Sequence, residues 1–127
     1  MSLLNKQITD LIEDKIEHRH GTLNTEIKFD KNFIGFNGHF PGNPVLPGVV
    51  MIKVMIRMYE LHQEKEYILL QIKQAKFISP VFADTIISFS VKPDTDQDGI
   101  KLSGKILKSE NVIAKISLVL QEGSEYF

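Results

Sequence analysis

The chain contains no cysteine, and this absence removes several kinds of chemistry. None of its 127 residues can form a disulfide, a catalytic thiolate or a cysteine-based metal site. Cysteine usage therefore leaves the redox compartment undetermined. The sequence also has no signal-peptide pattern and no apolar run of membrane-spanning length, so we expect a cytoplasmic protein without a membrane partner.

An excess of charge of either sign is also missing. Fifteen lysine and arginine residues balance sixteen aspartate and glutamate residues, which gives a formal net charge of −1. Such a chain has no general attraction for nucleic acid or for an anionic membrane surface. With 43% hydrophobic and 24% charged residues, the composition is that of a globular protein with one core. We therefore expect a single domain over residues 1–127 and no nucleic-acid partner.

Proline and glycine are few, but they are concentrated in one loop. Three of the five prolines and three glycines lie between residues 38 and 48. Proline fixes some backbone angles and glycine allows left-handed ones, so this loop has a defined shape. Pro47 suits the first position of a helix, because that position needs no intrahelical N–H bond. The sequence predicts a central helix over residues 47–63.

Nearly all side chains of this helix are large and apolar, which indicates a helix buried on almost every side. The polar exceptions are Lys53, Arg57 and Glu60, whose spacing places them on one stripe. The first amides of the helix have no intrahelical partner and carry the positive end of its dipole, near the loop that holds His39. An imidazole beside free N–H donors and an apolar wall is typical of a site that stabilises a negatively charged carbonyl oxygen.

The remaining segments predict one more helix and a set of strands. An amphipathic helix occupies the N-terminal residues 1–20 and ends at His18–Gly21. His18 and His20 would not share a helix face, so we expect no metal site there and none elsewhere. In the strand after the central helix, Ile68, Leu70 and Ile72, with Ala75, are expected to face inward. The predicted strands cover residues 23–29, 67–77, 85–92, 100–108 and 112–120, with turns at Asp98-Gly99 and Ser109–Asn111.

This order predicts an α+β fold in which one antiparallel sheet wraps around the buried central helix, with an additional N-terminal amphipathic helix. Two motifs then identify a resemblance. The chain resembles the 3-hydroxyacyl-(acyl carrier protein) dehydratases of type II fatty-acid synthesis, which have the hot-dog fold. The matching residues are Gly38-His39-Phe40-Pro41-Gly42, Pro44, Pro47-Gly48-Val49, Lys76-Phe77-Ile78-Ser79-Pro80-Val81 and Asp84.

The resemblance implies a thioester of acyl carrier protein as the substrate, no cofactor, and a homodimer in which each site combines the histidine of one subunit with the helix of the other. Dehydration needs a base for the C2 proton, a donor to the thioester oxygen and a proton for the departing hydroxyl. His39 fits the first role, because an imidazole titrates near neutral pH. The amide of Gly48, aided by Val49, fits the second.

The third role exposes a departure from the family. The family has a carboxylic acid fourteen positions after the histidine, and Lys53 stands at that position here. An ammonium is a poorer proton donor than a carboxylic acid unless its surroundings make it more acidic. Lys53 therefore has two interpretations. Either its surroundings make it acidic enough to donate the proton, or it is a solvated residue at the end of a polar stripe on which Arg57 and Glu60 pair with each other. Variants of this kind are similar to hot-dog proteins of aryl polyene or flexirubin pigment synthesis.

Apolar residues crowd the approach to His39, and they have two interpretations. Phe36 and Phe40 either pack in the core or line a tunnel for the acyl chain, as the resemblance implies. The expected substrate-binding residues are Phe36, Phe40, Pro41, Gly42, Pro47 and Val49. Four cations could meet an acidic carrier protein, or they could simply be solvated: Lys6, Arg57, Lys73 and Lys76.

Three functions remain open from the sequence. The first is a dehydratase-like lyase acting on 3-hydroxyacyl-(acyl carrier protein) thioesters in fatty-acid or polyene-type synthesis. The second is a non-catalytic acyl-thioester-binding subunit, or one half of a heterodimer whose partner supplies the acid. The third is a hot-dog acyl thioesterase, although that chemistry also places a carboxylate where Lys53 stands.

Overall fold

The computed structural model describes residues 2–37, 44–96 and 99–124. The described chain forms two α-helices, one short 3-10 helix and six strands. Their bounds are α1 (Leu3–Ile12), β1 (Glu17–Arg19), β2 (Thr22–Lys28), η1 (Ile34–Phe36), α2 (Gly48–Gln63), β3 (Tyr67–Phe77), β4 (Ile86–Asp96), β5 (Gly99–Lys108) and β6 (Asn111–Glu122). No helix in these described segments has the length and apolar character needed to cross a membrane.

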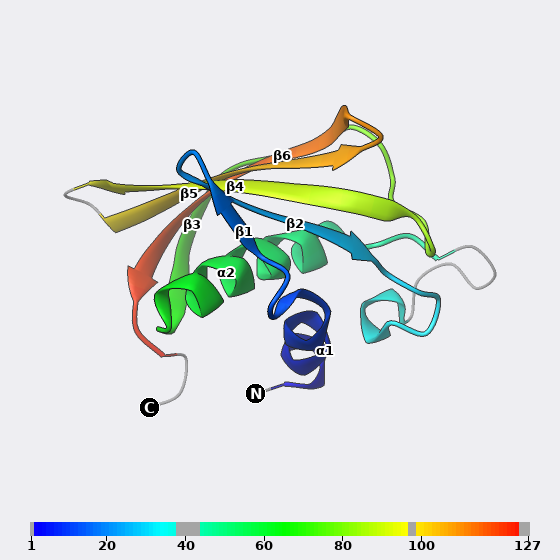
Figure 1. Cartoon of the computed structure of the whole chain (residues 1–127), viewed down its shortest axis with the longest axis horizontal. Coiled ribbons are helices and arrows are strands. Elements are labelled where there is room, and N and C mark those ends of the chain that lie inside the picture. Colours follow the sequence, from blue (N-terminus) through cyan, green and yellow to red (C-terminus); the bar gives the residue numbers. More distant parts are fainter. Residues whose placement is uncertain (1, 38–43, 97–98, 125–127) are drawn as a thin grey trace.

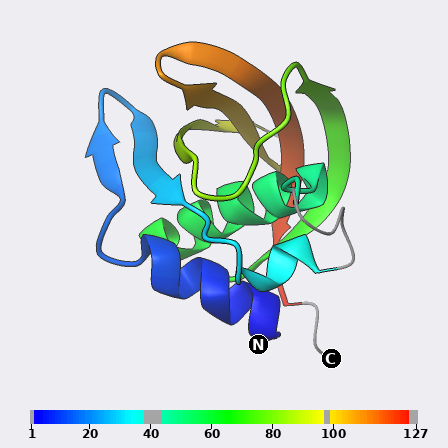
Figure 2. The same ribbon diagram turned by 90° about the vertical axis from the view of Figure 1, so that its right-hand side faces the viewer.

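The six strands form one antiparallel sheet in the order β1-β2-β4-β5-β6-β3. Both helices lie on the same side of this sheet (Figure 1). The view along the sheet shows the strands curving around α2, with α1 beneath it (Figure 2). This is the arrangement that the order of elements predicts, because a helix that is apolar on most sides needs a curved sheet to cover it.

The core lies between α2 and the concave face of the sheet. Three α2 residues, Val54, Met55 and Met58, are completely buried. Met55 comes so close to β5 that a Cβ on Gly104 would lie 2.5 Å from its terminal methyl carbon. Glycine at this position therefore allows close packing of α2 on β5. The hydrophobic strand residues that are at most 3% exposed are Leu23, Ile27, Ile87, Phe89, Val91, Leu102, Ile106, Ala114, Ile116, Leu118 and Leu120.

The N-terminal helix is shorter than the sequence predicts. Helix α1 ends at Ile12, because Glu13 is extended and Asp14 adopts a left-handed conformation with φ of 62°. The chain then enters the short strand β1, which the hydrophobic spacing did not indicate. Instead of ending a helix, His20 and Gly21 form a hairpin turn with φ values of 51° and 78°.

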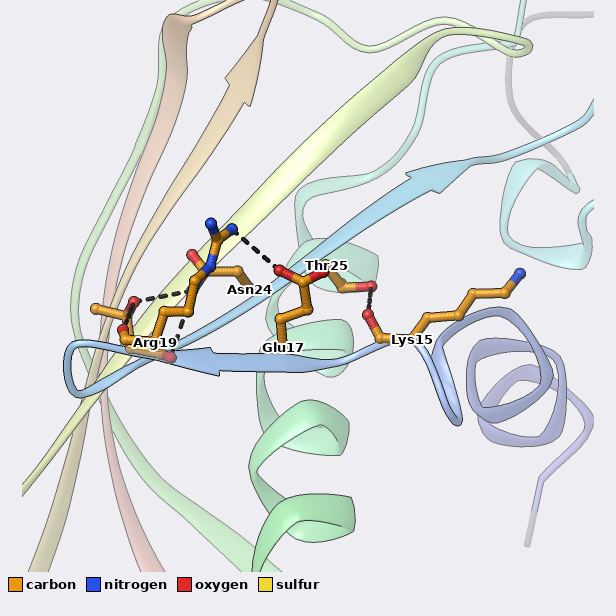
Figure 3. Close-up of polar contacts among 6 residues, drawn as sticks. Lys15, Glu17, Arg19, Asn24 and Thr25 are labelled. Carbon is orange, nitrogen blue, oxygen red and sulfur yellow. Dashed lines mark hydrogen bonds and ion pairs between the residues drawn. The ribbon is translucent and has the colours of Figure 1, made fainter.

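Polar contacts lie within this unexpected hairpin and between it and the segment that precedes it (Figure 3). Arg19 and Glu17 form an exposed ion pair at 3.1 Å. The hydroxyl of the buried Thr25 donates a 3.2 Å hydrogen bond to the Lys15 carbonyl oxygen. That bond fixes the segment between α1 and β1, and it explains why the apolar pattern that continues to Ile16 does not extend the helix.

Strand β3 has the predicted bounds but not the predicted burial. Leu70 and Ile72 are 53% and 47% exposed, and Ala75 is exposed as well. The burial expected for Leu70, Ile72 and Ala75 was therefore wrong, whereas Ile68 is half-buried. Strand β3 is an edge strand, and two register shifts against β6 interrupt its alternation. A period-two pattern does not show that a strand lies at an edge.

Candidate functional site

The first part of the predicted site lies outside the described residues. His39, Phe40, Pro41 and Gly42 belong to residues 38–43, so their roles remain expectations. The described part of the site begins at Pro44 and continues into α2. It consists of the segment that enters the helix, the first turn of the helix and the polar stripe that starts at Lys53.

The segment before α2 is held by the chain that follows β3. The Leu46 amide donates a 2.8 Å hydrogen bond to the Val81 carbonyl oxygen. Next to it, Val45 and Phe82 form an isolated antiparallel bridge. Val81 is buried and follows Pro80, so the second sequence motif supports the first one. The direction in which α2 starts is therefore fixed by two segments far apart in the sequence.

The first turn of α2 leaves backbone donors available. Pro47 is the N-cap residue and offers no side-chain hydrogen bond, because its ring has no polar group. The Val50 amide donates to the Pro47 carbonyl oxygen at 3.0 Å. Within the described residues, the amides of Gly48 and Val49 have no such partner. Two N–H groups at the positive end of the helix dipole therefore have no acceptor among the described residues, and this position suits them to bind an oxygen that carries negative charge.

An aromatic ring lies directly against the first residue of this helix. A Cβ on Gly48 would lie 2.4 Å from the Cζ atom of Phe77. Phe77 is 48% exposed, and Val49 is 56% exposed. Sequence analysis gave Phe77 no role, although it is part of the second motif. The free amides therefore lie beside a partly open apolar surface.

Lys53 lies about 7.5 Å further along the helix axis, since each residue adds about 1.5 Å of rise. It is partly buried and lines a pocket of about 140 Å³ between α1, α2, the start of β3 and the end of β6. Within the described segments, its ammonium group makes no hydrogen bond or ion pair. The pocket lining consists of Asn5, Lys53, Ile56, Arg57, Glu60, Glu66, Tyr67, Leu69, Gly123 and Ser124.

The other two members of the polar stripe are engaged in structural contacts. Arg57 donates from Nε to the Thr9 hydroxyl at 2.7 Å and lies 3.4 Å from a Glu60 carboxylate oxygen. The second oxygen of Glu60 accepts the Tyr67 amide at 2.9 Å. Arg57 therefore connects α2 to α1, and Glu60 connects α2 to β3. Lys53 is left as the cation of the stripe without a partner among the described residues.

Two tyrosines, one of which lines the pocket, pack together where α2 lies beside β3. The rings of Tyr59 and Tyr67 are 4.9 Å apart, and Tyr59 is only 5% exposed. Burial raises the pKa of the Tyr59 phenol above its usual value, and the neighbouring Tyr67 raises it further. Sequence analysis did not single out either residue, because tyrosines at helix and strand ends are ordinary core residues.

The structure also describes three of the predicted substrate-binding residues, Phe36, Pro47 and Val49. Phe36 is 4% exposed and packs edge-on against Phe33, with ring centroids 5.9 Å apart. Pro47 and Val49 lie at the helix start as expected. In the described parts of the chain, no group of three or more histidine, aspartate or glutamate side chains is arranged to hold a metal ion.

Comparison with known sequences places this site in a family context. Residues 15–117 match the family model named ApeI-like and described as ApeI dehydratase. A relative from Fusobacterium nucleatum, named 3-hydroxyacyl-[acyl-carrier-protein] dehydratase FabZ, is 34% identical over 65% of this chain and 62% of its own length. A relative of the same name from Levilactobacillus brevis is 31% identical over 72% of this chain and 68% of its own. The match therefore spans less than two thirds of the first of these relatives.

Solved structures share the fold at low sequence identity. The Xenorhabdus doucetiae dehydratase heterocomplex ApeI:P aligns with a TM-score of 0.71 and 19% identity, over 87% of this chain and 97% of that chain. A hypothetical thioesterase from Streptococcus pneumoniae, solved with coenzyme A, aligns with a TM-score of 0.65 and 14% identity over 87% and 85%. The predicted hot-dog fold is thus confirmed. Because the family model covers most of its length, the chain belongs to the ApeI-like family of dehydratases.

Proposed function

We propose that the chain is a dehydratase that removes water from 3-hydroxyacyl thioesters of acyl carrier protein. The observation that carries this proposal is the pair of amides at Gly48 and Val49, which have no acceptor among the described residues and lie at the start of a largely buried helix, beside a half-exposed aromatic ring. The names of the relatives support the same reaction class.

The reaction can be assigned to residues of this chain. His39 takes the proton from C2, and the electron pair of that C–H bond moves toward the thioester carbonyl to give an enolate, which forms the C2–C3 double bond when the C3–O bond breaks. The charge that develops on the thioester oxygen is bound by the Gly48 amide, with Val49 beside it. The C3–O bond then breaks, and the hydroxyl leaves as water once it receives a proton. Lys53 is our candidate for that donor, because it lines a pocket and its ammonium group has no hydrogen-bond or ion-pair partner in the described chain.

The exposed edge of the sheet supports assembly into a dimer. Strand β3 and the residue that follows it present a sheet edge together with four exposed apolar side chains. These residues are Leu70, Ile72, Phe77 and Ile78. We propose that a second subunit pairs along β3 and brings its own residue-39 loop to this helix. Sedimentation of the purified chain should give the mass of two copies, whereas the mass of one copy would contradict the proposal.

The lysine at position 53 favours a second candidate function. If Lys53 does not donate a proton, the chain would bind an acyl thioester without turnover, or it would need a partner subunit that carries the acid. The Xenorhabdus doucetiae neighbour is a heterocomplex, which makes a mixed pair a concrete alternative for this chain.

Turnover by the purified chain separates these candidates. The substrate is a 3-hydroxyacyl thioester of acyl carrier protein, and the product, a 2-enoyl thioester, is followed by its absorbance. Activity that is lost in His39→Ala supports the dehydratase. An inert chain that gains activity with Lys53→Glu supports the subunit that lacks an acid. Release of free thiol would instead indicate a thioesterase and would contradict both.

A further inference from the structure

The side chain of Phe77 reaches from the sheet to the first residue of α2. Phe77 is the last residue of β3 and lies opposite Ala114 of β6, which is completely buried. Directly opposed residues of an antiparallel pair point to the same face of a sheet, so Phe77 points to the concave face. The backbone beside it is fixed, because the Ile78 amide donates a 2.8 Å hydrogen bond to the Ile113 carbonyl oxygen.

The ring meets Gly48 with its tip. A Cβ on Gly48 would lie 2.4 Å from the Cζ atom of Phe77 and 2.9 Å from each of its two Cε atoms. Gly48 does not have a positive φ, so its backbone conformation is one that other residues adopt. The ring of Phe77 is therefore what leaves no room for a side chain at position 48.

The tip of the ring lies on the side of Gly48 from which a hydrogen-bond acceptor approaches. The Cα–Cβ bonds of a helix tilt toward its amino end, and the amide N–H groups point toward the same end. The position of a Cβ on Gly48 is therefore on the same side as its N–H group. An oxygen bound to this group lies about 2.9 Å from the nitrogen and has the Phe77 ring beside it.

The geometry of an acyl group then determines which of its atoms meets the ring. When the Gly48 amide binds the thioester oxygen, C2 lies only about 2.4 Å from that oxygen, two bonds away. Phe77 is 48% exposed, so part of the ring is uncovered and can contact a ligand. A C2 atom with two hydrogens fits beside the ring, whereas a methyl branch on C2 needs the space that the ring occupies.

We propose that Phe77 restricts the substrate to acyl thioesters that are unbranched at C2. This inference rests on the proposed function, because it places the thioester oxygen at the Gly48 amide. Phe77 takes no part in proton transfer, and it acts only through the space that its ring fills. The contact joins β3 to the start of α2, so it arises only in the folded chain.

The experiment compares two substrates on each variant of the full chain. These are the 3-hydroxybutyryl and the 2-methyl-3-hydroxybutyryl thioesters of acyl carrier protein, the second as both C2 epimers, each of which keeps one C2 hydrogen for removal. The measured quantity is the ratio of the two kcat/KM values for formation of the 2-enoyl thioester. This ratio does not depend on the folded fraction of the sample, so a loss of stability cannot imitate a change in selectivity.

Two substitutions change the ring, and a third is a matched control. Phe77→Ala removes the ring, and Phe77→Leu replaces it by a shorter apolar side chain. The control is Ile72→Ala, which truncates an apolar side chain of the same strand with nearly the same exposed fraction, 47%. Ile72 is five residues earlier in β3, about 16 Å away along an extended strand.

We expect the wild type to prefer the unbranched substrate. The relative kcat/KM for the branched substrate should rise by about tenfold in Phe77→Ala, which is the usual effect of making room for one methyl group. Phe77→Leu should give a smaller rise, and Ile72→Ala should leave the ratio unchanged.

Two kinds of failure can be told apart. An unchanged ratio in Phe77→Ala, or an equal change in Ile72→Ala, while the unbranched substrate is still converted, would overturn the role of Phe77 and leave the proposed function standing. No conversion of either substrate by the wild type would contradict the proposed function, and the role of Phe77 with it.

Discussion

The two ends of α2 differ in how their polar groups are used. At the carboxyl end, Glu60 accepts the Tyr67 amide and lies against Arg57, and the left-handed Glu64 turns the chain toward β3. At the amino end, the cap residue is a proline without a side-chain hydrogen bond, and the amides of Gly48 and Val49 find no partner in the described chain.

The carboxyl end of α2 therefore contributes to the stability of the fold, and the amino end is available for function. The contacts at the carboxyl end join α2 to α1 and β3, so they stabilise the fold. The donors at the amino end stabilise nothing in the described structure, and they lie at the positive pole of the helix dipole. The first amides of a helix are satisfied by a side chain, by water or by a ligand, and their place at this pole suits them to bind an oxygen that carries negative charge. The four predictions below test this division.

The largest effect is expected at the amino end, from the residue that we assign as the base. His39→Ala should lower turnover of a 3-hydroxyacyl thioester by roughly 10²- to 10⁴-fold, because general base catalysis is removed. The free energy of unfolding, measured with urea, should change little. Strong unfolding without a specific loss of turnover in the folded fraction would place His39 among the structural residues.

A pair of substitutions at Gly48 isolates the backbone donor. Both alanine and proline add a Cβ that must displace the Phe77 ring, but only proline removes the N–H group. Proline fits this first helical position, and Pro47 has the extended ψ of 145° that a following proline requires. We expect kcat/KM of Gly48→Pro to be roughly 10²-fold below that of Gly48→Ala. Similar values for the two variants would show that the amide does not take part.

At the carboxyl end of α2, a substitution should lower the stability of the fold and leave turnover unchanged. Glu60→Ala removes the acceptor for the Tyr67 amide and the partner of Arg57, both of them largely buried. We expect a loss of about 2 kcal/mol in the free energy of unfolding. Turnover per folded molecule should remain close to that of the wild type. Gln63→Ala, an exposed change in the same turn, is the control and should have little effect on stability.

The smallest effect concerns Tyr59 and appears only in alkali. Because burial raises the pKa of Tyr59 in the folded chain, its contribution to stability is full below the unfolded pKa of about 10. The contribution is lost as the pH rises through the higher folded value. The stability advantage of the wild type over Tyr59→Phe should therefore shrink above pH 10, as urea unfolding at several pH values can show. An advantage that does not change with pH would contradict this assignment.

The sequence predicted the central elements well because their signals are local. The proline before Gly48 and the apolar run after it defined α2, and the period-two pattern gave the bounds of β3. The turn at Ser109 and Glu110 was also predicted, and both residues have the positive φ of a tight hairpin. These features depend on short stretches of backbone and side-chain chemistry.

Other features depend on partners that are distant in the sequence, and these were not predicted. The bond from Thr25 to Lys15 that accompanies the end of α1 joins two separate segments. The exposure of Leu70 reflects the position of β3 at the edge of the sheet. The contact of Phe77 with Gly48 likewise joins two motifs that the sequence presents far apart. Spacing along the chain contains none of this information.

The central claim is that the free amides at the start of α2 bind a thioester oxygen. Nuclear magnetic resonance of the ¹⁵N-labelled chain tests it directly, by titration with an unreactive amide analogue of a 3-hydroxyacyl pantetheine thioester. The account predicts downfield shifts of the Gly48 and Val49 amide protons, with little change at the Tyr67 amide, which Glu60 already binds. Unchanged Gly48 and Val49 signals, with shifts elsewhere at saturation, would contradict it.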